Sequence, residues 1–232
     1  MPLARKKSLR TSRTPPSLIA NQFVSRFIAS ENALICSGCV AVDPKRHKVA
    51  FIHDAAKGIN QLPKGRKNIG EDIHAAALRE TQEETGLTVT PLTLRAATRA
   101  TPTEDMLREY VDPEEIKQET TEDEEGWEDV HEDTMASLPG ASGLTNWVQH
   151  CEPIGITTHL CEETLAHKVI FWYAAQADST IPPRQDTREH WEQQYELKWV
   201  DAREAAKLMT FEADGQAIEK ALSDMRRSGY EI

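Results

Sequence analysis

Residues 65–87 read GRKNIGEDIHAAALRETQEETGL, which is the most informative stretch of the chain. We expect one helix from about Asp72 to Thr85, which Gly86 would close as a C-cap. A glycine loop at Gly65 leads into the helix, whose N-terminus favours anions through its unpaired backbone N–H groups and its dipole. The pattern therefore predicts a helix that directs side chains towards a glycine loop.

Three carboxylates gather on one face of this helix. Glu80, Glu83 and Glu84, the glutamate cluster, are three and four residues apart. Like charges at these spacings destabilise a helix by about 0.2–0.5 kcal/mol per pair. The same stripe begins with apolar residues, so it should face the protein body, where carboxylates must be paired or bind a metal. Because Mg²⁺ prefers oxygen ligands and binds beside substrate phosphates, a divalent site is favoured over a solvated acidic surface.

The helix and the loop before it resemble the Nudix box. Thr81 stands where an aliphatic residue is usual, and the other fixed positions are filled. Matches at eight positions of fixed spacing within 23 residues make a specific signal. The resemblance implies an α/β/α sandwich with a mixed β-sheet, and looser similarity extends it to about residues 33–225. The matching positions are Gly65, Glu71, Arg79, Glu80, Glu83, Glu84, Gly86 and Leu87.

The resemblance also implies a reaction. Proteins of this family bind Mg²⁺ or Mn²⁺ against a diphosphate, and water attacks a phosphorus. In this chain the glutamate cluster would supply metal ligands, together with the carbonyl oxygen of Gly65. Arg79 would orient these catalytic carboxylates, and Glu71 would help to fix their geometry. Divalent ions are needed because carboxylates alone would repel a diphosphate.

The general base of the reaction is either a glutamate of the box or a later acid, and the sequence leaves both alternatives open. Glu80 is the candidate inside the box, and Glu189, Glu192 and Glu196 are candidates in the segment REHWEQQYELKW. Glu196, in a short predicted strand, is also expected as an additional metal ligand. Surface charge is the alternative for each of the later acids.

Basic residues near the loop are candidates for contacts with phosphate. Lys64 lies in a Pro-Lys-Gly run and is the preferred contact, and Arg66 follows Gly65. Lys168 could contribute from the start of a predicted strand. A solvated surface position is the alternative for Arg66. The aromatic residues of the later strands fit a core better than base stacking.

The net charge of −11 belongs to one segment of the chain. Residues 103–134 hold 15 acidic and two basic residues, a net charge of −13, and without them the remainder carries +2. A segment this acidic, with few large apolar residues, cannot bury enough surface to become ordered. We therefore expect a mobile insertion. A solvated surface loop is favoured over a lid or a docking segment.

Composition limits the other possibilities. The 232 residues suffice for one domain with a substantial core, and no apolar run is long enough to span a membrane. Residues 1–20 are basic and are expected to form a disordered tail before a single domain over residues 21–232. We expect an intracellular protein of the cytoplasm or nucleus, without a strong signal for nucleic-acid binding.

Two of the four cysteines share the spacing of a zinc half-site. Cys36 and Cys39 lie in the apparent strand ALICSGCVAV, where residues three apart point to opposite faces. Buried free thiols are therefore expected in place of a zinc site.

Hydrophobic patterns predict strands on both sides of the helix. Two strands at 33–43 and 48–53 would form a hairpin, and 87–98 is strand-like but interrupted by Pro91. Further strands are expected at 153–160, 168–177 and 195–200. Asp201 would cap a helix that runs to about Met209, and a last helix would cover about 214–226.

The box indicates which bond is broken and leaves the substrate open. The resemblance favours a nucleoside diphosphate linked to another group, with a dinucleoside polyphosphate first, a diphosphoinositol polyphosphate second and ADP-ribose third. Tyr110 and Pro102 are the nearest equivalents of residues expected in the first and third classes. A non-catalytic Nudix-like binding module is the alternative of another kind. The retained glutamate cluster argues for catalysis.

Overall fold

The computed structural model describes residues 27–96, 98, 100, 103, 106, 149–161, 164–184 and 194–232. The N-terminal tail, nearly all of the acidic insertion, and the acids Glu189 and Glu192 lie outside these residues, as do Pro102 and Tyr110. In this part of the chain, no helix has the length and hydropathy needed to cross a membrane.

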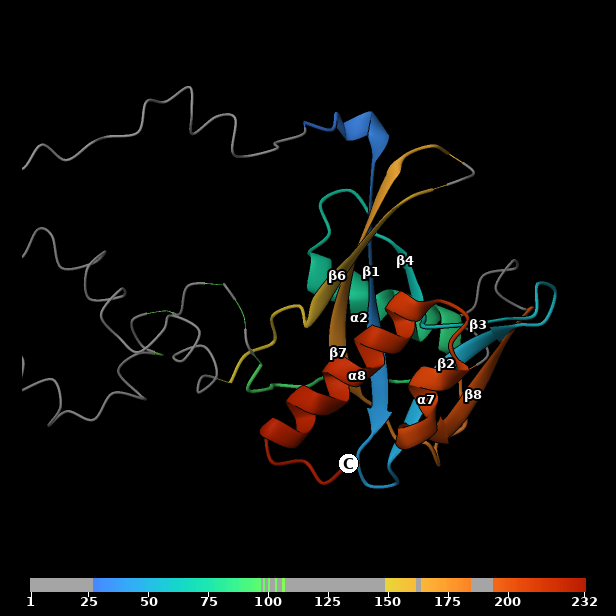
Figure 1. Ribbon diagram of the computed structural model, residues 1–232, viewed down its shortest axis with the longest axis vertical. Coiled ribbons are helices and arrows are strands. Elements are labelled where there is room, and N and C mark those ends of the chain that lie inside the picture. Colours follow the sequence, from blue (N-terminus) through green and yellow to red (C-terminus); the bar gives the residue numbers. More distant parts are fainter. Residues whose placement is uncertain are drawn as a thin grey trace, which may run out of the picture.

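The described residues form one eight-stranded mixed sheet (Figure 1). Its main path runs β3-β2-β1-β7-β5, while β4 pairs with β1, β6 with β7 and β8 with β2. A short 3₁₀ helix over Ser30–Asn32 precedes the first strand. The strands are β1 (Ala33–Asp43), β2 (Lys48–Asp54), β3 (Ile59–Gln61), β4 (Lys64–Arg66), β5 (Thr90–Pro91), β6 (Gly155–Leu160), β7 (His167–Gln176) and β8 (Tyr195–Asp201).

Strand β1 is the centre of the sheet and changes its antiparallel partner along its length. Its C-terminal end pairs with β2, with Val42 opposite Val49. Its N-terminal half pairs with β4, with Gly38 opposite Lys64. On its other edge it runs parallel to β7 from Ala33 onward. The sheet therefore opens between β2 and β4, next to the segment that enters the box.

Among the described residues, three α-helices cover the two faces of the sheet (Figure 1). Helix α2 (Ile73–Thr85) lies on one face, and α7 (Ala202–Leu208) and α8 (Glu212–Arg227) lie on the other. Alternate residues of β1 divide between two cores, with Val40 among the residues that pack with α8 and Cys39 among those that pack with α2. We call these two sides the α8 face and the α2 face. Helices on both faces of one mixed sheet make an α/β/α sandwich, which confirms the fold class predicted from the sequence.

Most predicted elements are confirmed within a few residues. The hairpin, the box helix, the later strands and the two C-terminal helices are present, and Asp201 caps α7 by accepting a hydrogen bond from the Arg203 N–H. The strand expected at 87–98 is reduced to the two-residue β5, because Pro91 has no N–H to donate to a ladder. The glycine loop also differs, since Gly65 lies within β4.

The cysteine prediction is confirmed for β1. Cys36 is buried in the core on the α8 face and Cys39 in the core on the α2 face. Both are free thiols. Since they point to opposite sides of the sheet, they cannot form the zinc half-site that their spacing suggests.

Candidate active site

Helix α2 is fixed at both ends by its own sequence. The Asp72 carboxylate accepts hydrogen bonds from the backbone N–H groups of His74 and Ala75 at 2.9 and 3.0 Å, which satisfies donors of the first turn. Gly86 ends the helix with φ of 75°, a left-handed conformation that favours glycine. The spacing of the glutamate cluster along the helix is thereby set by regular helical geometry.

A buried stripe of α2 faces the sheet, and it includes polar residues. Thr81 lies in this stripe, where its hydroxyl accepts a hydrogen bond from the Cys39 N–H at 3.0 Å and donates one to the Ala77 carbonyl at 2.7 Å. The hydroxyl thus ties α2 to the central strand, a role that an aliphatic residue cannot perform. The buried residues of α2 are Ala76, Ala77, Glu80, Thr81, Glu84 and Thr85.

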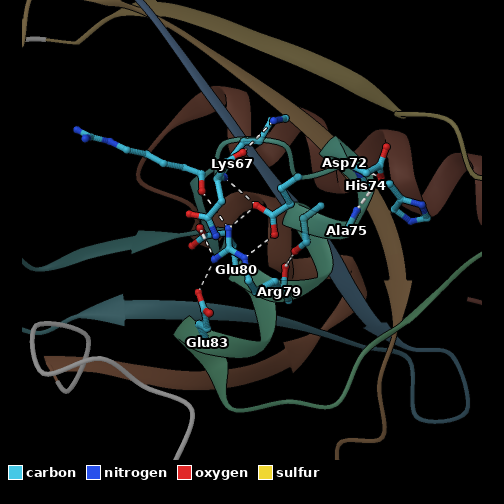
Figure 2. A network of polar contacts seen from close by, with 12 residues as sticks. Lys67, Asp72, His74, Ala75, Arg79, Glu80 and Glu83 are labelled. Carbon is cyan, nitrogen blue, oxygen red and sulfur yellow. Dashed lines mark hydrogen bonds and ion pairs between the residues drawn. The ribbon is translucent and has the colours of Figure 1, made fainter.

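Arg79 is the centre of a network of carboxylates (Figure 2). Its Nε and Nη2 donate to the two oxygens of Glu71 at 2.7 and 2.9 Å. Its Nη1 lies 2.7 Å from Glu80 and 2.6 Å from Glu83, and Nη2 also donates to the Arg66 carbonyl at 3.0 Å. One guanidinium therefore orients three carboxylates and offsets part of their negative charge.

The charges of this network are strongly coupled. The hydrogen bonds from Arg79 are the largest cause that lowers the pKa of Glu71 to about 2. The carboxylates in turn raise the pKa of Arg79, above all through its hydrogen bonds with Glu71. Glu71 is therefore ionised throughout the physiological range and holds Arg79 from the side opposite the glutamate cluster.

Two members of the cluster are directed at β4. A Cβ atom added to Gly65 would lie 1.7 Å from Oε2 of Glu80, so only glycine leaves room for this carboxylate. An oxygen of Glu84 accepts a hydrogen bond from the backbone N–H of Lys64 at 2.7 Å. The box helix and the strand that precedes it thus meet through two carboxylates of α2, at Lys64 and at Gly65.

Comparison of the sequence with models of protein families finds a match, and the matched residues include the box helix and β4. A family model for the NUDIX domain matches residues 35–151, just over half of the chain. The chain belongs to the Nudix family. Proteins of this family hydrolyse pyrophosphate bonds and generally use divalent metal ions. The chain is accordingly a Nudix hydrolase of such bonds.

Solved structures of Nudix hydrolases are similar over most of the chain, at low identity. One from Nitrosomonas europaea is 16% identical, covers 82% of this chain and 89% of that chain, and gives a TM-score of 0.44. The C. elegans Ap4A hydrolase is 15% identical, with coverage of 82% and 97% and a TM-score of 0.44. The E. coli dihydroneopterin triphosphate pyrophosphohydrolase is 15% identical, with coverage of 80% and 92% and a TM-score of 0.41. Among curated proteins no match was found.

The donor set of the Nudix box fits a hard divalent cation. Its carboxylate oxygens are the ligands that Mg²⁺ and Mn²⁺ take, and the absence of a Cβ at Gly65 lets the Glu80 carboxylate lie against β4. Within the described residues, no three carboxylate, imidazole or thiol groups already converge as a metal site. In this structure Arg79 contacts Glu80 and Glu83.

The predicted phosphate contacts lie together on the α8 face. Lys64 and Arg66 flank Gly65 in β4 and pair with Gly38 and Cys36. Because Gly65 meets the α2 side, the side chains of its two neighbours point to the α8 face. Lys168 pairs with Leu34 of β1, which packs against the core on the same face. Strand register therefore brings together basic residues from distant parts of the chain.

Glu196 lies in a different environment from the other candidate ligands. It pairs with His53 across β2 and β8, and its carboxylate forms an ion pair with Lys198 at 2.7 Å. Its side chain is 55% exposed, and the Lys198 ammonium lowers its pKa. Val49 of β2 pairs with Val200 of β8, and both pack in the core on the α8 face. Glu196 lies four residues before Val200 in the same strand, so its side chain also points to the α8 face. The glutamate cluster approaches from the α2 face instead.

The predicted core role of the aromatic residues is confirmed for Trp172, which is buried in the core on the α8 face. Tyr173 is buried on the opposite side, where its ring stacks on His74 with centroids 4.6 Å apart. Both rings therefore pack within the protein.

Sequence reasoning missed one buried acid near the box. Asp214 was expected only as the start of the last helix, yet its carboxylate accepts a hydrogen bond from the Leu62 N–H at 3.0 Å. No motif marks this residue, because the contact joins segments that are distant in sequence. An acid at a predicted helix start is usually a cap, and this was its only local signal.

Proposed function

We propose that this chain is a Mg²⁺- or Mn²⁺-dependent hydrolase that cleaves a diphosphate bond in a nucleoside diphosphate linked to another group. A dinucleoside polyphosphate is the first candidate substrate. The observation that carries the proposal is the Arg79 network, in which one guanidinium orients Glu71, Glu80 and Glu83 beside β4.

The roles of the residues follow from their contacts. The glutamate cluster and the Gly65 carbonyl would hold the metal ions, which polarise phosphoryl oxygens and lower the pKa of a bound water. Arg79 positions two of the carboxylates through contacts of 2.6 and 2.7 Å. Glu71 holds Arg79 in place through both of its oxygens. Such preorganisation removes side-chain motion from the reacting geometry.

A diphosphoinositol polyphosphate is the second candidate substrate. Inositol pyrophosphates require a strongly basic site, and the sequence alone contains no dense basic cluster at one place. The folded chain gathers Lys64, Arg66 and Lys168 on one face, which favours a substrate with several phosphates. This arrangement also suits the phosphate chain of a dinucleoside polyphosphate.

A substrate screen with the purified full-length chain tests the proposal. Diadenosine tetraphosphate, ADP-ribose, oxidised nucleoside triphosphates and inositol pyrophosphates would be incubated with Mg²⁺ or Mn²⁺, and the products identified. We expect metal-dependent cleavage of a polyphosphate substrate, and severe loss of turnover in the Glu83→Gln and Glu84→Gln variants with the fold intact. Near-normal hydrolysis in either variant, or no hydrolysis by the parent chain, would refute the proposal.

A further inference from the structure

The α8 face carries a cluster of ionisable side chains contributed by three strands and one helix. His159 of β6 pairs with Lys168 of β7, which pairs with Leu34 of β1. On the other edge of β1, Lys64 of β4 pairs with Gly38. All of these side chains share the face covered further along by α8. His159 is exposed and both lysines are partly exposed, so solvent reaches the cluster.

Asp214 is the acidic member of this cluster. It lies in the first turn of α8, is 4% exposed, and interacts electrostatically with Lys64, Lys168 and His159. Burial raises its pKa, while the Leu62 N–H and the three basic groups oppose that rise. The side-chain amide of Gln61 accepts a hydrogen bond from Nζ of Lys64 at 2.9 Å. The Lys64 side chain is therefore held by Gln61 and interacts electrostatically with Asp214.

The segment from Leu62 to Lys64 is held from both faces of the sheet. Asp214 accepts from the Leu62 N–H at 3.0 Å on one side, and Glu84 accepts from the Lys64 N–H at 2.7 Å on the other. A buried carboxylate that accepts from a backbone N–H makes a charge-assisted hydrogen bond, which is stronger than a neutral one. The position of the Lys64 side chain relative to Gly65 thus depends on two carboxylates, of which only Glu84 belongs to the box.

A second buried acid on α8, Asp224, has partners of a different kind from those of Asp214. Asp224 is fully buried, and its carboxylate is paired within α8, with Lys220 and Arg227. Those pairs neutralise its charge within the helix. Asp214 instead reaches across to the strand that enters the box, which is the arrangement of a residue that positions a neighbouring site.

We propose that Asp214 is a positioning residue that holds Lys64, together with Lys168 and His159, as a binding site for the substrate phosphates beyond the scissile bond. The inference rests on the proposed function, since the bond that is cleaved would lie at the glutamate cluster beside Gly65. Lys64 adjoins that position in sequence and points to the α8 face. Phosphates that continue from the cleaved bond to the α8 face would then meet these three basic groups.

Binding of inorganic tripolyphosphate to the full-length chain tests this site directly. Titration calorimetry in EDTA prevents both hydrolysis and the formation of metal–phosphate complexes. We expect Lys168→Ala and Asp214→Ala each to weaken tripolyphosphate binding by about tenfold, through loss of a charged contact and of its positioning. Asp214→Asn keeps an oxygen that can accept from the Leu62 N–H, so its affinity should stay within about threefold of the parent chain.

Two matched controls separate positioning from stability. Lys198→Ala removes another strand lysine of the α8 face, and Asp224→Ala removes the other buried acid of α8. Both should leave tripolyphosphate binding unchanged. With the substrate found in the screen, Asp214→Ala should raise KM by about tenfold and change kcat by less than about threefold, and Asp214→Asn should restore KM.

The outcomes distinguish this inference from the proposed function. If the parent chain hydrolyses its substrate but the Lys168 and Asp214 variants bind tripolyphosphate like the parent, the inference fails alone. Failure of the parent chain to bind tripolyphosphate also overturns it. If Asp214→Ala lowers only the melting temperature, as Asp224→Ala should, Asp214 merely anchors α8. Absence of any hydrolysis in the screen refutes the proposed function, whether or not the chain binds tripolyphosphate.

Discussion

Arg79 shows how much of the site depends on the shape of one side chain. Its guanidinium forms hydrogen bonds or ion pairs with Glu71, Glu80 and Glu83, and it also reaches the Arg66 carbonyl. Five donors in a rigid plane make this possible, whereas a lysine offers a single ammonium. The positive charge alone would therefore not reproduce the network.

Substituting Arg79 by lysine should separate charge from geometry. We expect Arg79→Lys to lower kcat/KM by about 10–100-fold, the usual effect of losing a partner that orients ligating carboxylates. Steady-state kinetics with the substrate from the screen would measure it. Arg46→Lys is the control, because Arg46 contacts Asp43 and Asp178. Unchanged kinetics in Arg79→Lys would show that charge alone is sufficient.

Gly65 is the other single residue on which the site depends. In Gly65→Ala the new methyl group would overlap the Glu80 carboxylate, which sits at the flexible end of its side chain and can move away. We therefore expect loss of most activity with only a small change in melting temperature. Gly155→Ala is the control, since a Cβ there meets no atom within 4 Å. Full activity of Gly65→Ala would show that the position of the Glu80 carboxylate against residue 65 is not required for turnover.

At the scale of elements, α2 is attached to the sheet by a hydrogen bond as well as by apolar packing. The Thr81 hydroxyl accepts from the Cys39 N–H in β1, and both residues are fully buried. Isosteric replacement by valine would leave this N–H without a partner in the core. The box helix is thereby kept in register with the central strand.

Thr81→Val should lower the free energy of unfolding by about 1–3 kcal/mol, the cost of a buried unsatisfied N–H. Urea denaturation would measure it. Thr81→Ser retains the hydroxyl and should lose less, although it removes a methyl group from the core. Equal stability of the valine variant and the parent chain would mean that the Cys39 N–H finds another acceptor.

Local spacing and long-range register differ in what they reveal about this site. The glutamate cluster is predictable because positions three and four apart on a helix are neighbours whatever the rest of the chain does. Strand β4 is too short for a period to show, so its glycine resembles a loop residue. Lys168, His159 and Asp214 meet Lys64 only through pairings across the whole sheet and a helix from the end of the chain. Such contacts leave no local pattern.

For the molecule as a whole, two carboxylates have low pKa values, and one of them, Asp43, joins distant segments by accepting a hydrogen bond from the Ser179 N–H. Hydrogen bonds from Arg79 hold the pKa of Glu71 at about 2. Burial raises the pKa of Asp43, but hydrogen bonds from Ser179 and Arg46 outweigh it and hold that pKa at about 2 as well. Their ordinary values are 4.5 for Glu71 and 3.8 for Asp43.

These shifts predict a loss of stability in acid. A carboxylate with a lowered pKa in the folded state stabilises the fold above its unfolded pKa, and that contribution is lost as the pH falls towards the folded value. Stability should therefore decline between pH 4.5 and about 2, the window set by Glu71 and Asp43. Urea midpoints measured from pH 7 to pH 3 would show it. Glu71→Gln and Asp43→Asn should each reduce the slope, and an unchanged slope in both would refute the assignment.

The pairing of β1 with β7 has a consequence for how the chain folds. These two parallel strands lie on opposite sides, in sequence, of the box and of the long connection from β5 to β6. The central ladder can therefore form only after a large loop has closed, and pairings of this kind slow folding. Because the entropy of closure grows only logarithmically, doubling such a loop costs about 0.6 kcal/mol. The length of this connection should therefore influence the folding rate much more than the final stability.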